Sequence, residues 1–171
     1  MINRGHPLAP TGRLLPAGLL AAGLLVSGCS QMTGDEAPGI AAESFDAARA
    51  LFDRFVVLGN DYDSGIAELY AEDAEILLIQ KKDGGEVRKV SVAGSDFKEL
   101  VPRILPRAEQ AGEQNTYSEV TYTDAGAERV RIDAQRTATP HGFTVPHILV
   151  VGPSPAEGEW LIYEEIAVTP L

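Results

Sequence analysis

The chain has 171 residues, with 14 basic and 25 acidic side chains and a formal net charge of −11. This acidic balance disfavours nucleic acid and anionic lipid headgroups as partners, because both are themselves negatively charged. The single cysteine excludes a disulfide within the chain, so the stability of a folded domain must come from core packing.

The first predicted element is an export signal. Arg4 and Arg13 accompany an apolar stretch over residues 14–26, which ends in small residues. A membrane-spanning helix needs about 20 apolar residues, so this stretch is too short to be one. Its end, Val26-Ser27-Gly28-Cys29, resembles the lipobox of bacterial lipoproteins. The resemblance implies that residues 1–28 are a lipoprotein signal peptide and that Cys29 is lipidated; the alternative is an ordinary signal peptide with an incidental cysteine.

The expected lipid anchor predicts where the protein is located. A cysteine bearing two or three acyl chains is a sufficient membrane attachment by itself. Ser30 follows Cys29 in place of an aspartate, which resembles the outer-membrane sorting signal of proteobacterial lipoproteins. We therefore expect a lipid-anchored cell-envelope protein, on the periplasmic face of the outer membrane if the host is Gram-negative.

Residues 29–42 are predicted to be the lipidated cysteine and a tether. They are small and polar and contain Pro38 and Gly39, a composition typical of flexible linkers. Residues 43–171 then form the folded domain, a normal size for a single domain.

Three helices are predicted in the first half of this domain. Ser44 can cap a helix that ends near Leu58, because apolar residues recur there at three- and four-residue steps. Capping groups over residues 61–64 favour a short second helix that reaches Tyr70. A third helix begins at Gly94, and Pro102 and Pro106 are expected to kink or shorten it because proline lacks the backbone N–H.

Six strands are predicted around the third helix and after it. Residues 75–80 and 87–92 form a hairpin around Asp83-Gly84. Four further strands cover residues 116–123, 128–139, 143–151 and 159–169, separated by Gly- and Pro-containing turns. Helices and strands that are segregated in this way indicate an α+β fold.

This order of elements resembles the nuclear transport factor 2-like superfamily, including its SnoaL-like and ketosteroid-isomerase-like members. Three segments carry the resemblance: Leu69-Tyr70-Ala71-Glu72-Asp73-Ala74, Val92-Ala93-Gly94-Ser95-Asp96-Phe97 and Trp160-Leu161-Ile162-Tyr163-Glu164. The resemblance implies a cone-shaped, bent mixed sheet of about six strands packed on three helices of the N-terminal half. It also implies an apolar pocket at the open end, and a homodimer, since members commonly dimerise through the sheet.

The isomerase-type members place a carboxylate base four residues after the last alanine of the first segment, and Leu78 occupies that position here. Their oxyanion-hole tyrosine corresponds to Arg54, or to Phe55 after a one-residue shift. These residues can neither transfer the proton nor stabilise the charge in that way. The comparison therefore predicts no steroid isomerisation.

Glu164 is the acid that the strand pattern singles out. Trp160, Ile162, Ile166 and Val168 share its parity on the last predicted strand, and alternate residues of a strand lie on one face. If this face lines the pocket, Glu164 is a desolvated carboxylate of the kind used by many catalytic acids. Two other interpretations remain, namely a pair with Arg136 and exposure through sheet twist.

The predicted domain contains two histidines, His141 and His147. His141 lies in a Pro-His-Gly turn and is expected in solvent. His147 lies in a strand; it either faces the pocket and pairs with Glu164 or packs in the core. The chain has no H-E-x-x-H motif, no metal-spaced histidine pair and no G-x-S-x-G motif, and we expect no metal and no cofactor.

Two classes of function are consistent with these features. The first is a non-catalytic lipoprotein whose domain binds a small apolar ligand or an envelope protein. The second is an enzyme with acid-base chemistry in its pocket, based on Glu164 and His147 with Arg136 in support. An enzyme needs at least two of these groups within hydrogen-bond reach in a concave site.

Overall fold

The computed structural model describes residues 40–82, 84–156 and 158–170. The chain divides into two units at Asp35–Glu36, and the described residues all belong to the second. The predicted signal peptide, Cys29 and nearly all of the tether lie outside the described residues. Among the helices described, none is long and apolar enough to cross a membrane.

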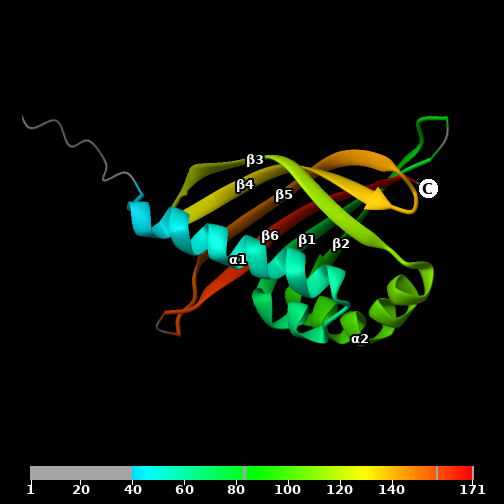
Figure 1. The fold of residues 1–171 in the computed structure, drawn as a ribbon. Helices are drawn as coiled ribbons and strands as arrows, with labels where there is room; N and C mark the ends of the chain where they lie inside the picture. Colours follow the sequence, from blue (N-terminus) through cyan, green and yellow to red (C-terminus); the bar gives the residue numbers. More distant parts are fainter. Residues whose placement is uncertain (1–39, 83, 157, 171) are drawn as a thin grey trace, which may run out of the picture. The chain divides into compact units, whose positions relative to one another are not determined.

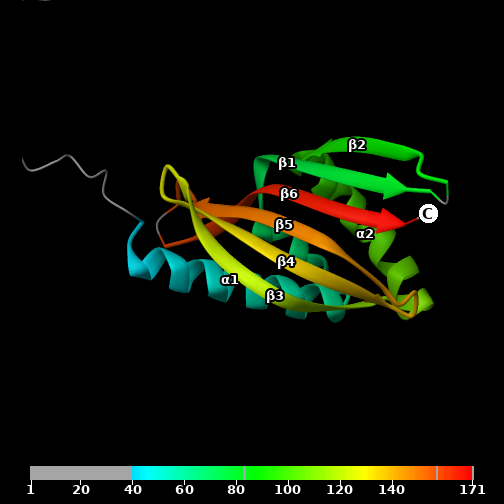
Figure 2. The same cartoon turned by 90° about the horizontal axis from the view of Figure 1, so that it is seen from above.

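The second unit has α+β architecture with one six-stranded mixed sheet. The strand order is β2-β1-β6-β5-β4-β3, and β1 and β6 are the one parallel pair in it (Figure 2). Helices α1 and α2 both lie below the curled sheet in Figure 1. In chain order the elements are α1 Ala42–Asn60, the 3₁₀ helix η1 Ser64–Leu69, β1 Tyr70–Lys81, β2 Val87–Ala93, α2 Gly94–Ala111, β3 Gln114–Gly126, β4 Arg129–Thr139, β5 Phe143–Pro153 and β6 Trp160–Pro170.

Helix α1 buries one apolar face against the sheet. Its buried residues, Ala48, Leu51, Phe52 and Phe55, recur at three- and four-residue steps, as the sequence predicted. The helix begins two residues before the expected cap: Ala41 is at the N-cap position without a side-chain hydrogen bond, and the Ser44 N–H donates to its carbonyl. No capping side chain therefore stabilises the start of this helix, and its buried apolar face begins only at Ala48.

Helix α2 continues through both of its prolines, so the expected shortening is wrong. Pro102 and Pro106 are exposed, and the helix continues to Ala111, where Gly112 forms the C-cap with a φ of 63°. Gly94, its first residue, packs so closely on β1 that an added Cβ would overlap the carbonyl oxygen of Ala71. This close approach explains the glycine at the start of the helix.

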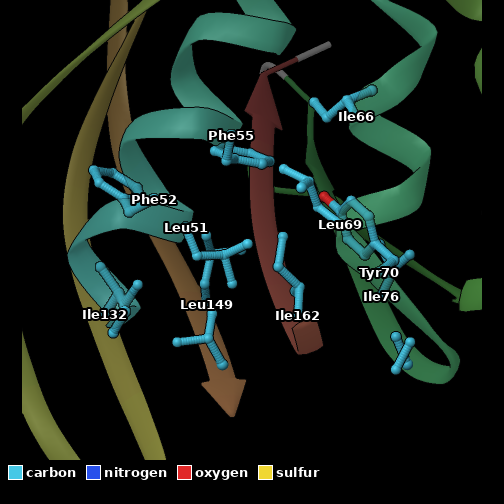
Figure 3. Close-up of a cluster of buried hydrophobic side chains, with 14 of the residues drawn as sticks. Leu51, Phe52, Phe55, Ile66, Leu69, Tyr70, Ile76, Ile132, Leu149 and Ile162 are labelled. Carbon is cyan, nitrogen blue, oxygen red and sulfur yellow. The ribbon is translucent and has the colours of Figure 1, made fainter. Parts of the chain in front are cut away.

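The core lies between α1, η1, the start of α2 and the inner face of the sheet. Figure 3 shows the α1 side chains above those of Ile132, Leu149 and Ile162 on the strands. Phe52, Phe55, Leu69 and Ile162 are buried in this core, whereas Phe45 and Ile166 are half-buried.

A β-bulge at Tyr163 explains why Ile162 and Ile166 do not lie on one face of β6, as their shared parity predicted. Ile162 and Glu164 of β6 pair with the adjacent residues Val151 and Val150 of β5, so β6 carries one extra residue there. An extra residue reverses the strand parity beyond it. The side chain of Ile162 thus faces the core before the bulge, and the side chain of Glu165 faces it after the bulge.

Candidate functional site

A small cavity lies between the C-terminal end of α1 and the inner face of the sheet, with a volume of about 90 Å³. Phe55 and Ile66 form part of its apolar wall. Its polar lining residues are Asn60, Asn115, Tyr117, Arg136, His147 and Glu165. We call this space the polar cavity.

The strand register brings the ionisable residues of the polar cavity together. His147 on β5 pairs with Ala134 on β4 and Ala167 on β6, so two small neighbours leave room for its ring. Arg136 lies two residues beyond Ala134 on the same face of β4, directly opposite Tyr117 of β3. Three neighbouring strands therefore supply Arg136, His147 and Glu165 to one face.

Glu165 is a buried carboxylate with two close partners. The hydroxyl of Tyr70 donates to its Oε2 at 2.6 Å, and His147 Nε2 lies 3.4 Å from its Oε1. Burial raises the pKa of Glu165, whereas the Tyr70 hydrogen bond and the charge of Arg136 act to lower it. Burial, and then the charge of Glu165, raise the pKa of Tyr70, which therefore keeps its proton and remains a donor.

His147 is buried in its neutral form. Burial, and then the nearby Arg136 charge, lower its pKa to about 3. A neutral imidazole has one N–H donor and one nitrogen acceptor. The ring packs against Phe55 and Tyr117, at centroid distances of 5.7 and 5.6 Å. Two aromatic side chains thus hold the ring in place beside Glu165.

Three buried nitrogen atoms at this site have no hydrogen-bond partner among the described residues: Nε of Arg136 and both ring nitrogens of His147. Arg136 is otherwise held by a hydrogen bond of 2.7 Å from Nη2 to the carbonyl oxygen of Val168. Buried polar groups in folded proteins are nearly always paired, so such atoms require an explanation. Their position around the cavity makes it the candidate functional site.

The wall beside Arg136 is fixed by a reciprocal pair of hydrogen bonds. The Asn60 side chain donates to the carbonyl oxygen of Asn115 at 2.9 Å and accepts from its N–H at 2.8 Å. This pair joins the end of α1 to the start of β3. The cavity wall therefore depends on contacts between distant segments rather than on one loop.

A second hollow, the outer pocket, has a volume of about 180 Å³ and shares Asn115 and Arg136 with the polar cavity. At its rim His141 stacks on Phe143, and its Nε2 lies 3.6 Å from Oε1 of Glu113. His141 is half-exposed, in keeping with the solvent position expected for it. Arg136 therefore lines both the polar cavity and the outer pocket.

The candidate residues from the sequence are only partly brought together. Arg136 and His147 line the polar cavity, but Glu164 is exposed on the opposite side of β6. The expectation that Glu164 faces the pocket is wrong because of the bulge at Tyr163, and Glu165 takes the inward position. Leu78, at the isomerase base position, packs against the core from β1.

Glu165, Tyr70 and Tyr117 are functional candidates that the sequence pattern did not single out. Glu164 and Glu165 are adjacent, so only strand parity could indicate which of them faces inward. The sequence has no glycine at the bulge that would have indicated a change of parity. Tyr70 was assigned to the end of a helix, and its partner Glu165 is 95 residues away. Contacts of this kind have no signal in local periodicity.

A larger hollow of about 400 Å³ lies elsewhere, along the flank of α1, η1 and the start of β6. It includes Trp160 and Arg54, the residue that corresponds to the oxyanion-hole tyrosine of the isomerase-type members. The charged side chains along it, Arg54, Glu68 and Glu159, are all exposed. We therefore base the candidate site on the polar cavity, where Glu165 and His147 are buried and three buried nitrogens have no hydrogen-bond partner among the described residues. Among the described residues there is no group of three or more acids and histidines that could hold a metal ion.

Comparison with known proteins supports the fold. No protein-family model matches the sequence, and no curated protein matches it. Solved structures do match. A nuclear transport factor 2-like protein of unknown function from Pseudomonas putida is 16% identical, has a TM-score of 0.55, and the match covers 75% of this chain and 87% of that one. A similar protein of unknown function from Shewanella oneidensis is 12% identical with a TM-score of 0.54, over 73% and 98% of the two chains.

A third match is a nuclear transport factor 2-like protein with a cystatin-like fold from Novosphingobium aromaticivorans. It is 15% identical with a TM-score of 0.52, and the match covers 74% of this chain and 81% of that one. The described unit is therefore an α+β domain with a curled mixed sheet, and its fold is nuclear transport factor 2-like. This fold hosts many functions, so the function must be argued from the site.

Proposed function

We propose that this protein is a lipid-anchored cell-envelope protein whose nuclear transport factor 2-like domain binds a small molecule in the polar cavity without transforming it. The observation that carries the proposal is the set of unpaired nitrogens of Arg136 and His147 around that cavity. A bound ligand that hydrogen-bonds to them would remove the cost of burying them unpaired.

The lining of the cavity changes the expected ligand chemistry. The sequence favoured an apolar ligand, but an apolar molecule would leave Arg136 and His147 unpaired and would desolvate Glu165 further. At about 90 Å³ the polar cavity is smaller than the 300–1,000 Å³ typical of ligand pockets. It therefore suits a very small polar molecule, or the polar end of a longer one that extends into the outer pocket.

The anchoring part of the proposal rests on the resemblance of Val26-Ser27-Gly28-Cys29 to a lipobox. Acylation of Cys29 would attach the chain to the membrane, and the residues that follow would connect it to α1. The same lipidated protein would then carry the polar cavity on a domain outside the bilayer.

Binding can be tested on protein purified in detergent from its own membranes. Small molecules released by denaturation are identified by mass spectrometry and compared with those from the variant Gly59→Leu. Gly59 lines the polar cavity, and the first added carbon meets only Ile66 there, at 3.4 Å. We expect one compound in near-stoichiometric amount with the wild type and its loss with Gly59→Leu.

Val57→Leu is the matched control, since Val57 is on the same helix and 56% exposed. It should retain the compound. Failure to recover a compound from the wild type, or equal recovery from Gly59→Leu, would contradict binding in the polar cavity.

An acid-base enzyme is the second candidate, and one observation favours it. Glu165 Oε1 and His147 Nε2 are 3.4 Å apart beside a cavity, which brings two proton-transfer groups together. Glu165 replaces Glu164 in this hypothesis. If the wild type converts the recovered compound on incubation and Glu165→Gln does not, the protein is an enzyme; an unchanged compound supports binding alone.

A further inference from the structure

Two opposite charges face the polar cavity from different strands. The Arg136 guanidinium comes from β4 and the Glu165 carboxylate from β6, and both line the same space. Among the described residues they form no direct ion pair with each other, although the Arg136 charge acts on Glu165. The cavity therefore separates a half-buried cation, whose Nε atom is buried, from a buried anion.

The balance of charge in this gap selects the charge of the ligand. The Tyr70 hydroxyl donates to Glu165 and the Arg136 charge acts on it, and both contacts favour the ionised carboxylate against the opposing effect of burial. With Glu165 ionised, His147 neutral and Arg136 positive, the lining has no net charge. A charged ligand would add an uncompensated buried charge, which is costly, whereas a neutral ligand would not.

The hydrogen-bonding groups that remain free select the ligand's polar groups. Glu165 Oε2 is occupied by Tyr70, which leaves Oε1 as an acceptor on the His147 side. Arg136 Nε–H is a free donor, and neutral His147 offers one donor and one acceptor. A ligand that satisfies both sides must itself carry an acceptor and a donor close together.

We propose that the ligand of the polar cavity is a neutral molecule with an amide-like group, which accepts a hydrogen bond from Arg136 and donates one to Glu165. This inference rests on the proposed binding function and deepens it by naming the class of ligand. The amide oxygen then lies next to Arg136 and the amide N–H lies next to Glu165. One planar group thereby bridges the two charges.

Three planar probes of nearly equal size test the proposal: acetamide is neutral, acetate is an anion and acetamidinium is a cation. The full chain is labelled with ¹⁵N at histidine, with His6→Gln to remove the histidine of the predicted signal peptide. The His147 ring reports on the polar cavity, and the half-exposed His141 ring is an internal reference. We expect acetamide to shift the His147 signals with an affinity at least about tenfold higher than that of acetate or acetamidinium.

Two substitutions should change the preference in opposite directions. Glu165→Gln leaves the Arg136 charge uncompensated, so acetate should become the tightest of the probes. Arg136→Gln leaves the Glu165 charge uncompensated, so acetamidinium should become the tightest. Glu164→Gln and Arg131→Gln are the controls, because these residues lie on the outer face of the same strands, and both should keep the acetamide preference.

The outcomes separate this inference from the function on which it rests. Tighter binding of acetate or acetamidinium to the wild type would overturn the neutral ligand while leaving small-molecule binding intact. An unchanged probe order in Glu165→Gln would overturn the bridging role of the two charges. If none of the probes shifts His147, both the inference and binding in the polar cavity are wrong. Should Arg136→Gln fail to fold, the wild type and the nearly isosteric Glu165→Gln suffice to decide.

Discussion

The Tyr70 hydroxyl donates a 2.6 Å hydrogen bond to Glu165 Oε2 within the core, and thereby connects the start of β1 to β6. Both residues are buried, with exposed fractions of 1% and 7%. Since a buried carboxylate must be hydrogen-bonded to be tolerated, this contact makes Glu165 possible at the inner face of the sheet. It also orients Oε1 of the same carboxylate towards His147.

Replacing Tyr70 by phenylalanine should destabilise the protein. The variant keeps the aromatic ring but removes the donor to a buried carboxylate, so we expect a loss of about 1–3 kcal/mol in the free energy of unfolding. Chemical denaturation of both proteins measures the loss. Tyr163→Phe is the control, because the Tyr163 hydroxyl donates to the Pro153 carbonyl at an exposed position and should matter less. Equal losses in the two variants would contradict a special role for the Tyr70–Glu165 bond.

The buried His147 should make the protein less stable in acid. Its pKa is about 3 in the folded state against an ordinary value of 6.5. The unfolded chain therefore binds more protons between these values, and the free energy of unfolding contributed by His147 falls as the pH is lowered from about 6.5 to 3. Unfolding curves measured across this range should show a steeper acid loss for the wild type than for His147→Phe.

His141→Phe is the matched control for this pH dependence, because His141 is half-exposed. It should follow the wild-type pH dependence. Glu165 acts in the opposite direction, since a raised folded-state pKa favours folding as the pH falls towards its ordinary value. The difference in pH dependence between the wild type and His147→Phe isolates the contribution of this histidine. Coincident unfolding free energies for these two proteins across the pH range would show that His147 does not titrate with unfolding.

Gly94 should tolerate no side chain. An added methyl group would overlap the Ala71 carbonyl oxygen and touch Ala74, so β1 and the start of α2 would have to separate. We expect Gly94→Ala to cost about 1–3 kcal/mol despite the higher helix propensity of alanine. Thermal unfolding compares it with Ser95→Ala, a change at the exposed next residue. A Gly94→Ala protein as stable as the wild type would mean that this contact is loose.

The proposed lipid anchor makes a prediction about localisation. Cys29→Ala removes the acylation site, so the protein should either leave the membrane fraction or keep residues 1–28. Fractionation and mass spectrometry of the native N-terminus measure both properties. Ser30→Ala is a control that keeps the cysteine. Native protein with an unmodified Cys29 would refute the anchor.

Several features of the fold could be predicted because they depend on neighbouring residues. The apolar face of α1, the Asp63 cap of η1 and most strand boundaries follow from local periodicity and turn residues. The α+β order of elements followed in turn, and the comparison with solved structures supports it. The helix through Pro102 and Pro106 was missed because its packing on β1 and η1 is a tertiary contact that compensates for the two lost donors.

The site depended on contacts that local patterns do not encode. His147 and Arg136 could be chosen from the sequence because each lies on a regular part of its strand, where alternation identifies the inward face. Glu165 could not, because the bulge at Tyr163 arises from the pairing of β6 with its neighbours and reverses the parity after it. The amino-acid sequence by itself thus determined the elements, the acidic charge and the lipobox-like segment. Only the tertiary structure decided which glutamate is buried, since that choice depends on the register between strands and on a tyrosine 95 residues away.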